Sequence, residues 1–153
     1  MKKIVLPAFI LIAAGLFAYF GGNNENPSVA SSPANKTSRA TQSNDDALDR
    51  AFKSHASGLP VAGEGRVKKI LNDDIEGSRH QRFIVRLSSG QTILIAHNID
   101  LAPRVPSLKE GDLVSFSGEY EWNRNGGTVH WTHRDPRGSH RAGWLRHEGR
   151  TFQ

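Results

Sequence analysis

The sequence predicts a mainly β protein: a small five-stranded barrel that follows a short helix, with a flexible linker and a transmembrane anchor before them. Two observations carry this prediction. Five short runs of β-branched and aromatic residues follow residue 62, and turn-forming residues separate them, as in small β-barrels. Before them, the N-terminus carries an uncharged apolar run and then a polar segment. With 153 residues, the chain is long enough for one domain once these ends are set aside.

The N-terminus has the features of a membrane anchor at residues 1–22. Lys2 and Lys3 precede 19 uncharged residues, Ile4–Gly22, close to the ~20 that cross a bilayer and longer than the roughly 7–15 of a secretory signal. Because the lysines come first, the positive-inside rule keeps the N-terminus in the cytoplasm. We therefore expect a single-pass inner-membrane protein with its C-terminal domain in the periplasm or otherwise outside the cytoplasm. The alternative is secretion after signal cleavage, because "SVA" at 28–30 has the small residues that a signal peptidase requires.

Residues 23–44 are dominated by Asn, Ser, Thr and Pro. A segment with so few large apolar residues cannot offset the entropy of ordering itself, so we expect a flexible linker. The folded domain is expected over residues 45–153. Its first element is a helix over about residues 45–55, because Ser43 suits the N-cap and Asp46 follows three residues later. The apolar face of this helix comprises Leu48, Ala51 and Phe52.

Five strands are predicted after the helix, from alternating apolar and polar residues. They are "GEGRVKKIL" (63–71), "HQRFIVRL" (80–87), "QTILIAH" (91–97), "DLVSFSGEYEW" (112–122) and "GTVHWTH" (127–133). The longest connection, residues 98–111, falls between the third and fourth strands and contains Pro103 and Pro106. This is the layout of the OB-fold, a small Greek-key barrel. A small β-sandwich and an SH3-like barrel stay open as alternatives, since strand order cannot be read from one sequence.

The fourth predicted strand has the clearest division into two faces, because successive residues of a strand point to opposite sides. The face expected in the core comprises Val114, Phe116, Tyr120 and Trp122, with Gly118 among them. The opposite face comprises Ser115, Ser117, Glu119 and Glu121.

Several blocks of the sequence carry a resemblance to a known family. They are "AHNIDLAPR", "GEYEWN", "GGTVHWTHRDPRGSH" and "GW" with the "H" that follows. Together they resemble the signature of a bacterial family of exported or anchored proteins known as domain of unknown function 3465, and the combination is more specific than any single block. The similarity covers roughly Gly63 to Gln153. The resemblance implies no activity and assigns no catalytic residue.

The segment "HWTHRDPRGSH" is the candidate metal or catalytic site. The chain has no cysteine, so only His, Asp and Glu remain as ligands. Residues three apart on a strand point to opposite faces, so His130 and His133 converge only if the strand ends by about Thr132. Asp135 before Pro136 permits such a turn. The candidate ligands of a divalent ion such as zinc or manganese are His130, His133, Asp135 and His140, with His147 as a further possibility.

A structural interpretation of the same segment is favoured. In it, hydrogen-bonded histidines brace an irregular C-terminal stretch, whose apolar anchors are Trp144, Leu145 and Phe152. Asp135 then accepts hydrogen bonds from the backbone of its own turn. This interpretation needs no cofactor.

A stripe of basic residues is the candidate ligand site. Arg66 and Lys68 alternate on the first strand, and His80, Arg82 and Arg86 share one face of the second. If these strands pair, the cations form a stripe on a surface that OB barrels use for elongated ligands. Aromatic residues are sparse on these strands, which argues against a nucleic-acid partner. The nearby Asp73 and Asp74 have the composition of a hairpin loop.

Two functions follow from these features. The leading hypothesis is a non-enzymatic, membrane-tethered binding module of the cell envelope for an anionic small molecule, glycan or lipid headgroup. The alternative is a small metal-dependent hydrolase, similar to a phosphodiesterase, with His133, Asp135 and His140 at its catalytic centre. No complete catalytic motif supports the second hypothesis, and the oligomeric state is not predicted.

Overall fold

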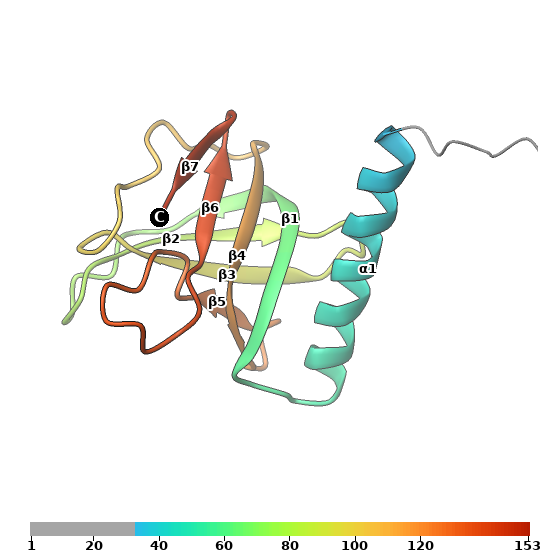
Figure 1. The fold of residues 1–153 in the computed structure, drawn as a ribbon, viewed down its shortest axis with the longest axis horizontal. Coiled ribbons are helices and arrows are strands. Elements are labelled where there is room, and N and C mark those ends of the chain that lie inside the picture. Colours follow the sequence, from blue (N-terminus) through green and yellow to red (C-terminus); the bar gives the residue numbers. More distant parts are fainter. Residues whose placement is uncertain (1–32) are drawn as a thin grey trace, which may run out of the picture. The chain divides into compact units, whose positions relative to one another are not determined.

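The computed structural model of the chain describes residues 33–153, without the side chains of residues 33–39 and Ser43. Its elements (Figure 1) are α1 (Pro33–Lys53), β1 (Leu59–Ile70), β2 (His80–Arg86), β3 (Thr92–Asn98), β4 (Leu113–Glu121), β5 (Thr128–His130), β6 (Trp144–His147) and β7 (Arg150–Phe152). The predicted anchor at residues 1–22 lies outside the described residues. Within the described part, no helix has the length and apolar character needed to cross a bilayer.

Helix α1 begins at Pro33 rather than near residue 45. The last part of the predicted linker, residues 33–44, is therefore helical. Proline suits the first turn of a helix, where its missing N–H costs no hydrogen bond, and Ala40 and Gln42 are good helix formers. The polar composition pointed to a tether, but packing of the C-terminal half, with Leu48 fully buried, stabilises the helix from one end.

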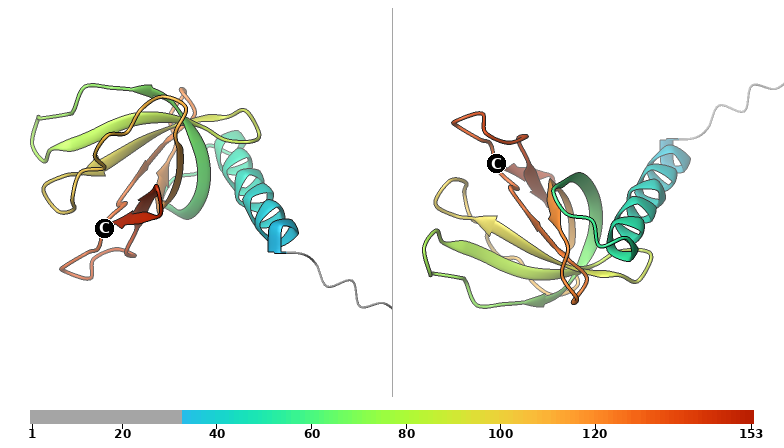
Figure 2. Two further views of the ribbon diagram at one scale, coloured as in Figure 1. Left: turned by 90° about the horizontal axis from the view of Figure 1, so that it is seen from above. Right: turned by 90° about the horizontal axis from the view of Figure 1, so that it is seen from below.

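The end of α1 agrees with the prediction. The N–H of Ala56 donates to the carbonyl of Ala51 at 3.0 Å, and His55 adopts the left-handed conformation with φ 55°. This is a Schellman motif, which satisfies the last carbonyls of a helix. Figures 1 and 2 show the helix alongside β1, outside the barrel.

Five strands close a barrel in the order β1-β2-β3-β5-β4, and β4 pairs back to β1. All neighbours are antiparallel except β3 and β5, which run parallel. The longest connection follows β3, as the sequence indicates. The closed barrel confirms the predicted OB-like class.

Strand β1 belongs to both halves of the barrel. Residues 59–66 pair with β4 and residues 66–70 pair with β2. The register shifts between Val67 and Lys69, and such a bulge lets one strand bend around the barrel. As a result, Lys68 and Lys69 are both exposed.

The core contains the predicted face of β4. Val114, Phe116 and Tyr120 are fully buried. Trp122 differs from the prediction, because it lies just beyond β4 and is only partly buried against the core. Its indole N–H donates to the carbonyl of Phe52 at 3.1 Å, so this side chain joins the barrel to the end of α1.

The proline-containing connection between β3 and β4 is held against the barrel by two buried polar side chains. Gln81 donates from Nε2 to the carbonyl of Val105 at 3.0 Å and accepts from the N–H of Val105 at 2.9 Å. His97 Nε2 lies 3.1 Å from the carbonyl of Pro103. The connection thereby buries Ala102 and Val105 without forming a helix.

The C-terminal stretch is a β-hairpin, which corrects the prediction of an irregular segment. Strand β6 pairs with β4, and β7 pairs with β6. Glu148 and Gly149 connect β6 and β7 with φ values of 48° and 74°, as a two-residue type I′ turn requires. Leu145 and Phe152, two of the predicted anchors, are buried. Trp144, the third, is half-buried.

Candidate functional site

At one end of the basic stripe on β1 and β2, the cationic side chains are exposed. Arg66 and Arg86 are directly opposite each other in the two strands, and both are exposed. They line a cavity of about 250 Å³ whose wall also includes Leu87, Leu113 and the carboxylate residue Glu64. One guanidinium nitrogen of Arg66 donates to a loop carbonyl at 3.0 Å. Two cations with apolar neighbours can receive one anionic group and an apolar portion beside it.

The charges of Lys68 and Arg86 are available to a ligand. Neither forms an ion pair with another described residue. Lys69 adds a third free cation on the same stretch, because the bulge in β1 exposes it beside Lys68. Sequence reasoning missed Lys69, since regular alternation places it on the inner face.

At the other end of the stripe, Arg82 and His80 lie beside Asp74. Arg82 donates from Nε to the carbonyl of Asn72 at 3.1 Å, and its guanidinium lies 3.8 Å from Asp74. His80 is half-buried and bridges Asp74 through two backbone hydrogen bonds. Asp73 forms an ion pair with Arg104, which is not part of the stripe. Among the five predicted ligand residues, Arg66, Lys68 and Arg86 therefore form the open cationic surface.

A second cavity of the barrel has an uncharged lining. On the outer side of β2 and β3, Ile84 and Leu94 line a cavity of about 220 Å³ with Asn123 and Asn125 from the connection between β4 and β5. OB barrels bind extended ligands at this place. Uncharged apolar and amide groups there suit a neutral portion of a ligand.

The histidine-rich segment forms a loop between β5 and β6. Strand β5 ends at His130, and Trp131 directly after it has a φ of 53°. The Trp131 ring lies 4.0 Å from the His140 ring and 5.9 Å from the His133 ring, measured between centroids, and His133 meets His140 edge-on at 5.2 Å. The three rings thus form one packed cluster.

The Nδ1 atoms of both histidines in this cluster are bonded to the loop itself. His133 Nδ1 donates to the carbonyl of Arg134 at 2.6 Å, and His140 Nδ1 donates to that of Arg141 at 2.8 Å. The carboxylate of Asp135 accepts from the backbone N–H of Arg137 and His140 and from the hydroxyl of Ser139, at 2.7–2.8 Å. These contacts fix the conformation of the loop.

The electrostatics of Asp135 follow from the same contacts. Burial opposes ionisation of its carboxyl group, but the hydrogen bonds from Arg137, His140 and Ser139 outweigh burial and hold its pKa well below the usual range. The carboxylate is therefore ionised at neutral pH, and its charge is satisfied within the loop.

The four predicted metal ligands do not come together as one set. Among the residues that the structure describes, one group of three ligand side chains has all its donor atoms within 4.8 Å of one another: Glu119, Glu121 and His130. His147, the further candidate, instead lies 3.0 Å from a carboxylate oxygen of Asp112.

His130 faces carboxylates of the neighbouring strand. Its Nε2 atom lies 3.9 Å from Glu119 Oε1 and 4.0 Å from Glu121 Oε1. Burial lowers the pKa of His130, while the two carboxylates oppose that shift and His140 and His80 add to it. Glu119 and Glu121 were predicted only as the outer face of β4. The pairing of β4 with β5, which a single sequence does not reveal, brings them to His130.

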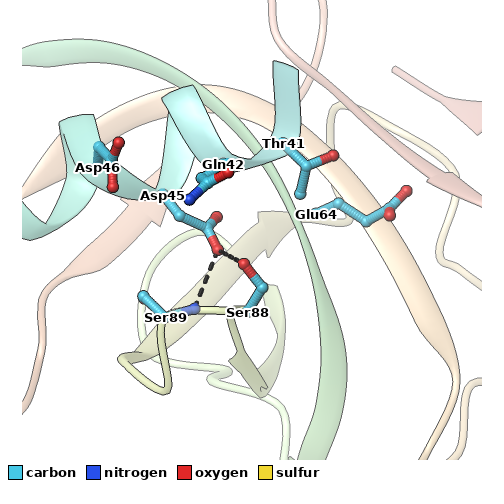
Figure 3. Close-up of a pocket in the computed structure, with 7 residues that line it drawn as sticks. All are labelled: Thr41, Gln42, Asp45, Asp46, Glu64, Ser88 and Ser89. Atoms are coloured by element: carbon cyan, nitrogen blue, oxygen red, sulfur yellow. Dashed lines mark hydrogen bonds between the residues drawn. The ribbon is translucent and has the colours of Figure 1, made fainter. Parts of the chain in front are cut away.

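A third cavity, of about 520 Å³, lies under helix α1 (Figure 3). Asp45 is almost fully buried there, and one of its carboxylate oxygens accepts from the hydroxyl of Ser88 and the N–H of Ser89. Asp46 and Glu64 also line the cavity. Asp45 thus fastens α1 to the turn between β2 and β3.

The comparisons with known proteins bear on the family of the chain and not on its activity. No curated protein matches the chain. A family model described as "protein of unknown function (DUF3465)" matches residues 31–153, which includes the whole of helix α1 and the barrel. The match agrees with the resemblance of the sequence blocks. The chain therefore belongs to the DUF3465 family.

Proposed function

We propose that the chain is a non-enzymatic binding module that an N-terminal apolar segment holds at the inner membrane, with its barrel outside the cytoplasm. Its ligand is an anionic small molecule, glycan or lipid headgroup, and the binding site is the open cationic surface of Arg66, Lys68 and Arg86. Lys69 extends this surface.

One observation carries the proposal. Two arginines face each other across β1 and β2 beside a cavity of about 250 Å³. Arginine presents a planar fork of donors that suits carboxylate, phosphate and sulfate groups. Like charges placed side by side repel each other, so an anion between them relieves an unfavourable arrangement. Leu87 and Leu113 in the same wall supply apolar contact for the rest of the ligand.

The location supports a ligand of the envelope. The uncharged run from Ile4 to Gly22 has the length of a membrane span, and the two lysines before it favour export of the remainder. A barrel held close to a membrane meets phospholipid headgroups and anionic glycans. A single cationic surface is then sufficient for function, without a catalytic group.

The proposal is tested by titrating the full-length protein in uncharged detergent with three probes: inorganic pyrophosphate, a sulfated disaccharide and short-chain phosphatidylglycerol. We expect saturable binding of at least one probe, weakened by added salt. Arg66→Gln combined with Arg86→Gln should weaken that binding at least tenfold, whereas Arg141→Gln, an exposed arginine of the loop between β5 and β6, should not. Binding by none of the probes, or binding that the paired variant leaves intact, contradicts the proposal. The probe that binds identifies the ligand class.

The hydrolase alternative receives less support from the geometry. Its proposed centre is His133, Asp135 and His140, and the hydrogen bonds of all three side chains are directed to the loop. The hydroxyl of Ser139 is the described nucleophile that contacts a carboxylate in that loop, and this carboxylate, of Asp135, already accepts two backbone N–H groups.

A further inference from the structure

We infer that Glu119, Glu121 and His130 form a site for a divalent transition-metal ion of the zinc type on the outer face of the barrel. This site differs in its residues from the cationic surface of the proposed function, and it does not depend on that function. It also differs from the ligand set expected in the loop after β5, with which it shares only His130.

The barrel holds the three side chains in place. Glu119 and Glu121 are two residues apart on β4, so they project to the same side of the sheet. His130 is the direct neighbour of Glu119 in β5, which puts its ring on that side as well. All three donors therefore come from paired strands and not from a mobile loop, and rigid elements keep metal ligands close to their binding positions.

An unsatisfied atom points to a ligand at this place. His130 Nε2 is buried, and no hydrogen-bond partner contacts it. A buried polar atom without a partner costs free energy. The lone pair of a neutral imidazole at this position would bind a metal ion directly, and the ion would at the same time bridge it to the two carboxylates.

The distances between the donor atoms suit a bound ion after the side chains move slightly closer together. Zinc binds nitrogen and oxygen ligands at about 2.0–2.2 Å, so two ligands of a tetrahedral ion are roughly 3.4 Å apart. The 3.9 and 4.0 Å separations from His130 to the carboxylates need to shorten by only about half an ångström, which rotation of flexible Glu side chains provides. Neither glutamate forms an ion pair with a described Lys or Arg, so no competing cation holds them.

The chemistry of the donors selects the class of metal. Imidazole favours zinc and related transition metals, whereas carboxylates alone favour magnesium and calcium. One imidazole with two carboxylates gives three protein ligands, which leaves a fourth position of a tetrahedral ion for water or another ligand.

The test is equilibrium dialysis of the full-length protein in detergent against zinc chloride, with Co²⁺ absorption as a second readout of ligand geometry. We expect one zinc per chain, and at least tenfold weaker binding in each of Glu119→Gln, Glu121→Gln and His130→Gln. His140→Gln is the matched control and should retain zinc. A circular-dichroism melt of each variant, recorded without metal, confirms that the barrel is folded.

Three outcomes overturn the inference. The first is the absence of zinc binding at up to millimolar free zinc. The second is zinc binding that persists in all three variants of the site. The third is zinc binding lost in the control His140→Gln but kept in Glu119→Gln and Glu121→Gln, since the metal would then belong to the loop after β5.

Discussion

The Nδ1 atom of His97 lies 2.8 Å from the hydroxyl oxygen of Thr132 in the barrel interior. The other ring nitrogen contacts the carbonyl of Pro103, which can only accept a hydrogen bond, so Nε2 carries the proton. Nδ1 of the neutral ring then accepts from the hydroxyl of Thr132. This histidine connects β3, the connection after β3 and the residues after β5 in one buried chain of hydrogen bonds.

The stability of the protein should fall as the pH decreases from about 6.5 to about 4 because of His97. Burial lowers its pKa to about 4 from the ordinary 6.5, against the opposing hydrogen bond to Pro103 and with a smaller contribution from His133. In this window the unfolded chain binds a proton that the folded chain does not, so acid favours unfolding. The loss reaches about 3 kcal/mol at pH 4 and stops growing below it. Urea denaturation at a series of pH values measures it.

The variant His97→Gln is the control for this prediction. It removes the titrating group, so the decrease of unfolding free energy between pH 6.5 and 4 should become smaller. Carboxylates with lowered pKa, such as Asp100 and Asp112, begin to lose their contribution as the pH falls through the ordinary Asp value of 3.8, so most of their loss comes below this window. An equally steep decrease in His97→Gln would assign the acid sensitivity to other groups.

The attachment of α1 should depend on Asp45. Asp45→Ala removes the acceptor for the Ser88 hydroxyl and the Ser89 N–H and leaves part-buried donors unpaired. A loss of about 1–3 kcal/mol in unfolding free energy is expected. Asp46→Ala, which removes the same charge from the exposed neighbour, should change it by less than about 0.5 kcal/mol. Equal effects of the two substitutions would show that charge, and not these hydrogen bonds, matters.

The barrel strands were predictable from the sequence because each contains β-branched or aromatic residues and lies between turn-forming residues, and the fourth also alternates in polarity. Leu113–Glu121 shows this best, since Val114, Phe116 and Tyr120 are buried at the predicted positions. The β6–β7 hairpin was not predicted because its strands, 4 and 3 residues long, contain a single β-branched residue, Thr151. Its turn also uses Glu148 before Gly149, and not the Asn or Asp that is typical of this turn type.

The candidate sites were less predictable than the fold, because they depend on which strands become neighbours. The pairing of Arg66 with Arg86 could be anticipated, since β1 and β2 are consecutive. The approach of Glu119 and Glu121 to His130 depends on the exact register of β4 against β5. The exposure of Lys69 depends on a bulge. A register shift of one residue reverses the face of every side chain that follows. No residue pattern in the sequence predicts the shift in β1.

The close approach of Gly63 to Phe116 should appear as a coupling between the two positions. A Cβ atom at residue 63 would lie 2.6 Å from the Phe116 Cζ atom, so Gly63→Ala should destabilise the barrel by roughly 1–3 kcal/mol through overpacking. Phe116→Leu alone should also destabilise it, because it leaves a gap in the core. In the double variant, the space left by the Phe116 ring accommodates the new methyl group of residue 63. The combined loss of unfolding free energy should therefore be less than the sum of the two single losses. Thermal or urea unfolding of the four proteins measures this, and simple additivity would contradict the contact.

The loop after β5 should depend on Asp135 for its structure and not for metal binding. Asp135→Ala removes the acceptor of three hydrogen bonds, from Arg137, Ser139 and His140, so the melting temperature should decrease while zinc binding stays unchanged. Asp135→Asn keeps the shape of the side chain and part of its accepting capacity, and it should have a smaller effect. Asp46→Ala controls for the loss of one negative charge. If Asp135→Ala instead abolished zinc binding and left the melting temperature unchanged, the loop would be a metal site, and the hydrolase alternative would replace the structural interpretation of this segment.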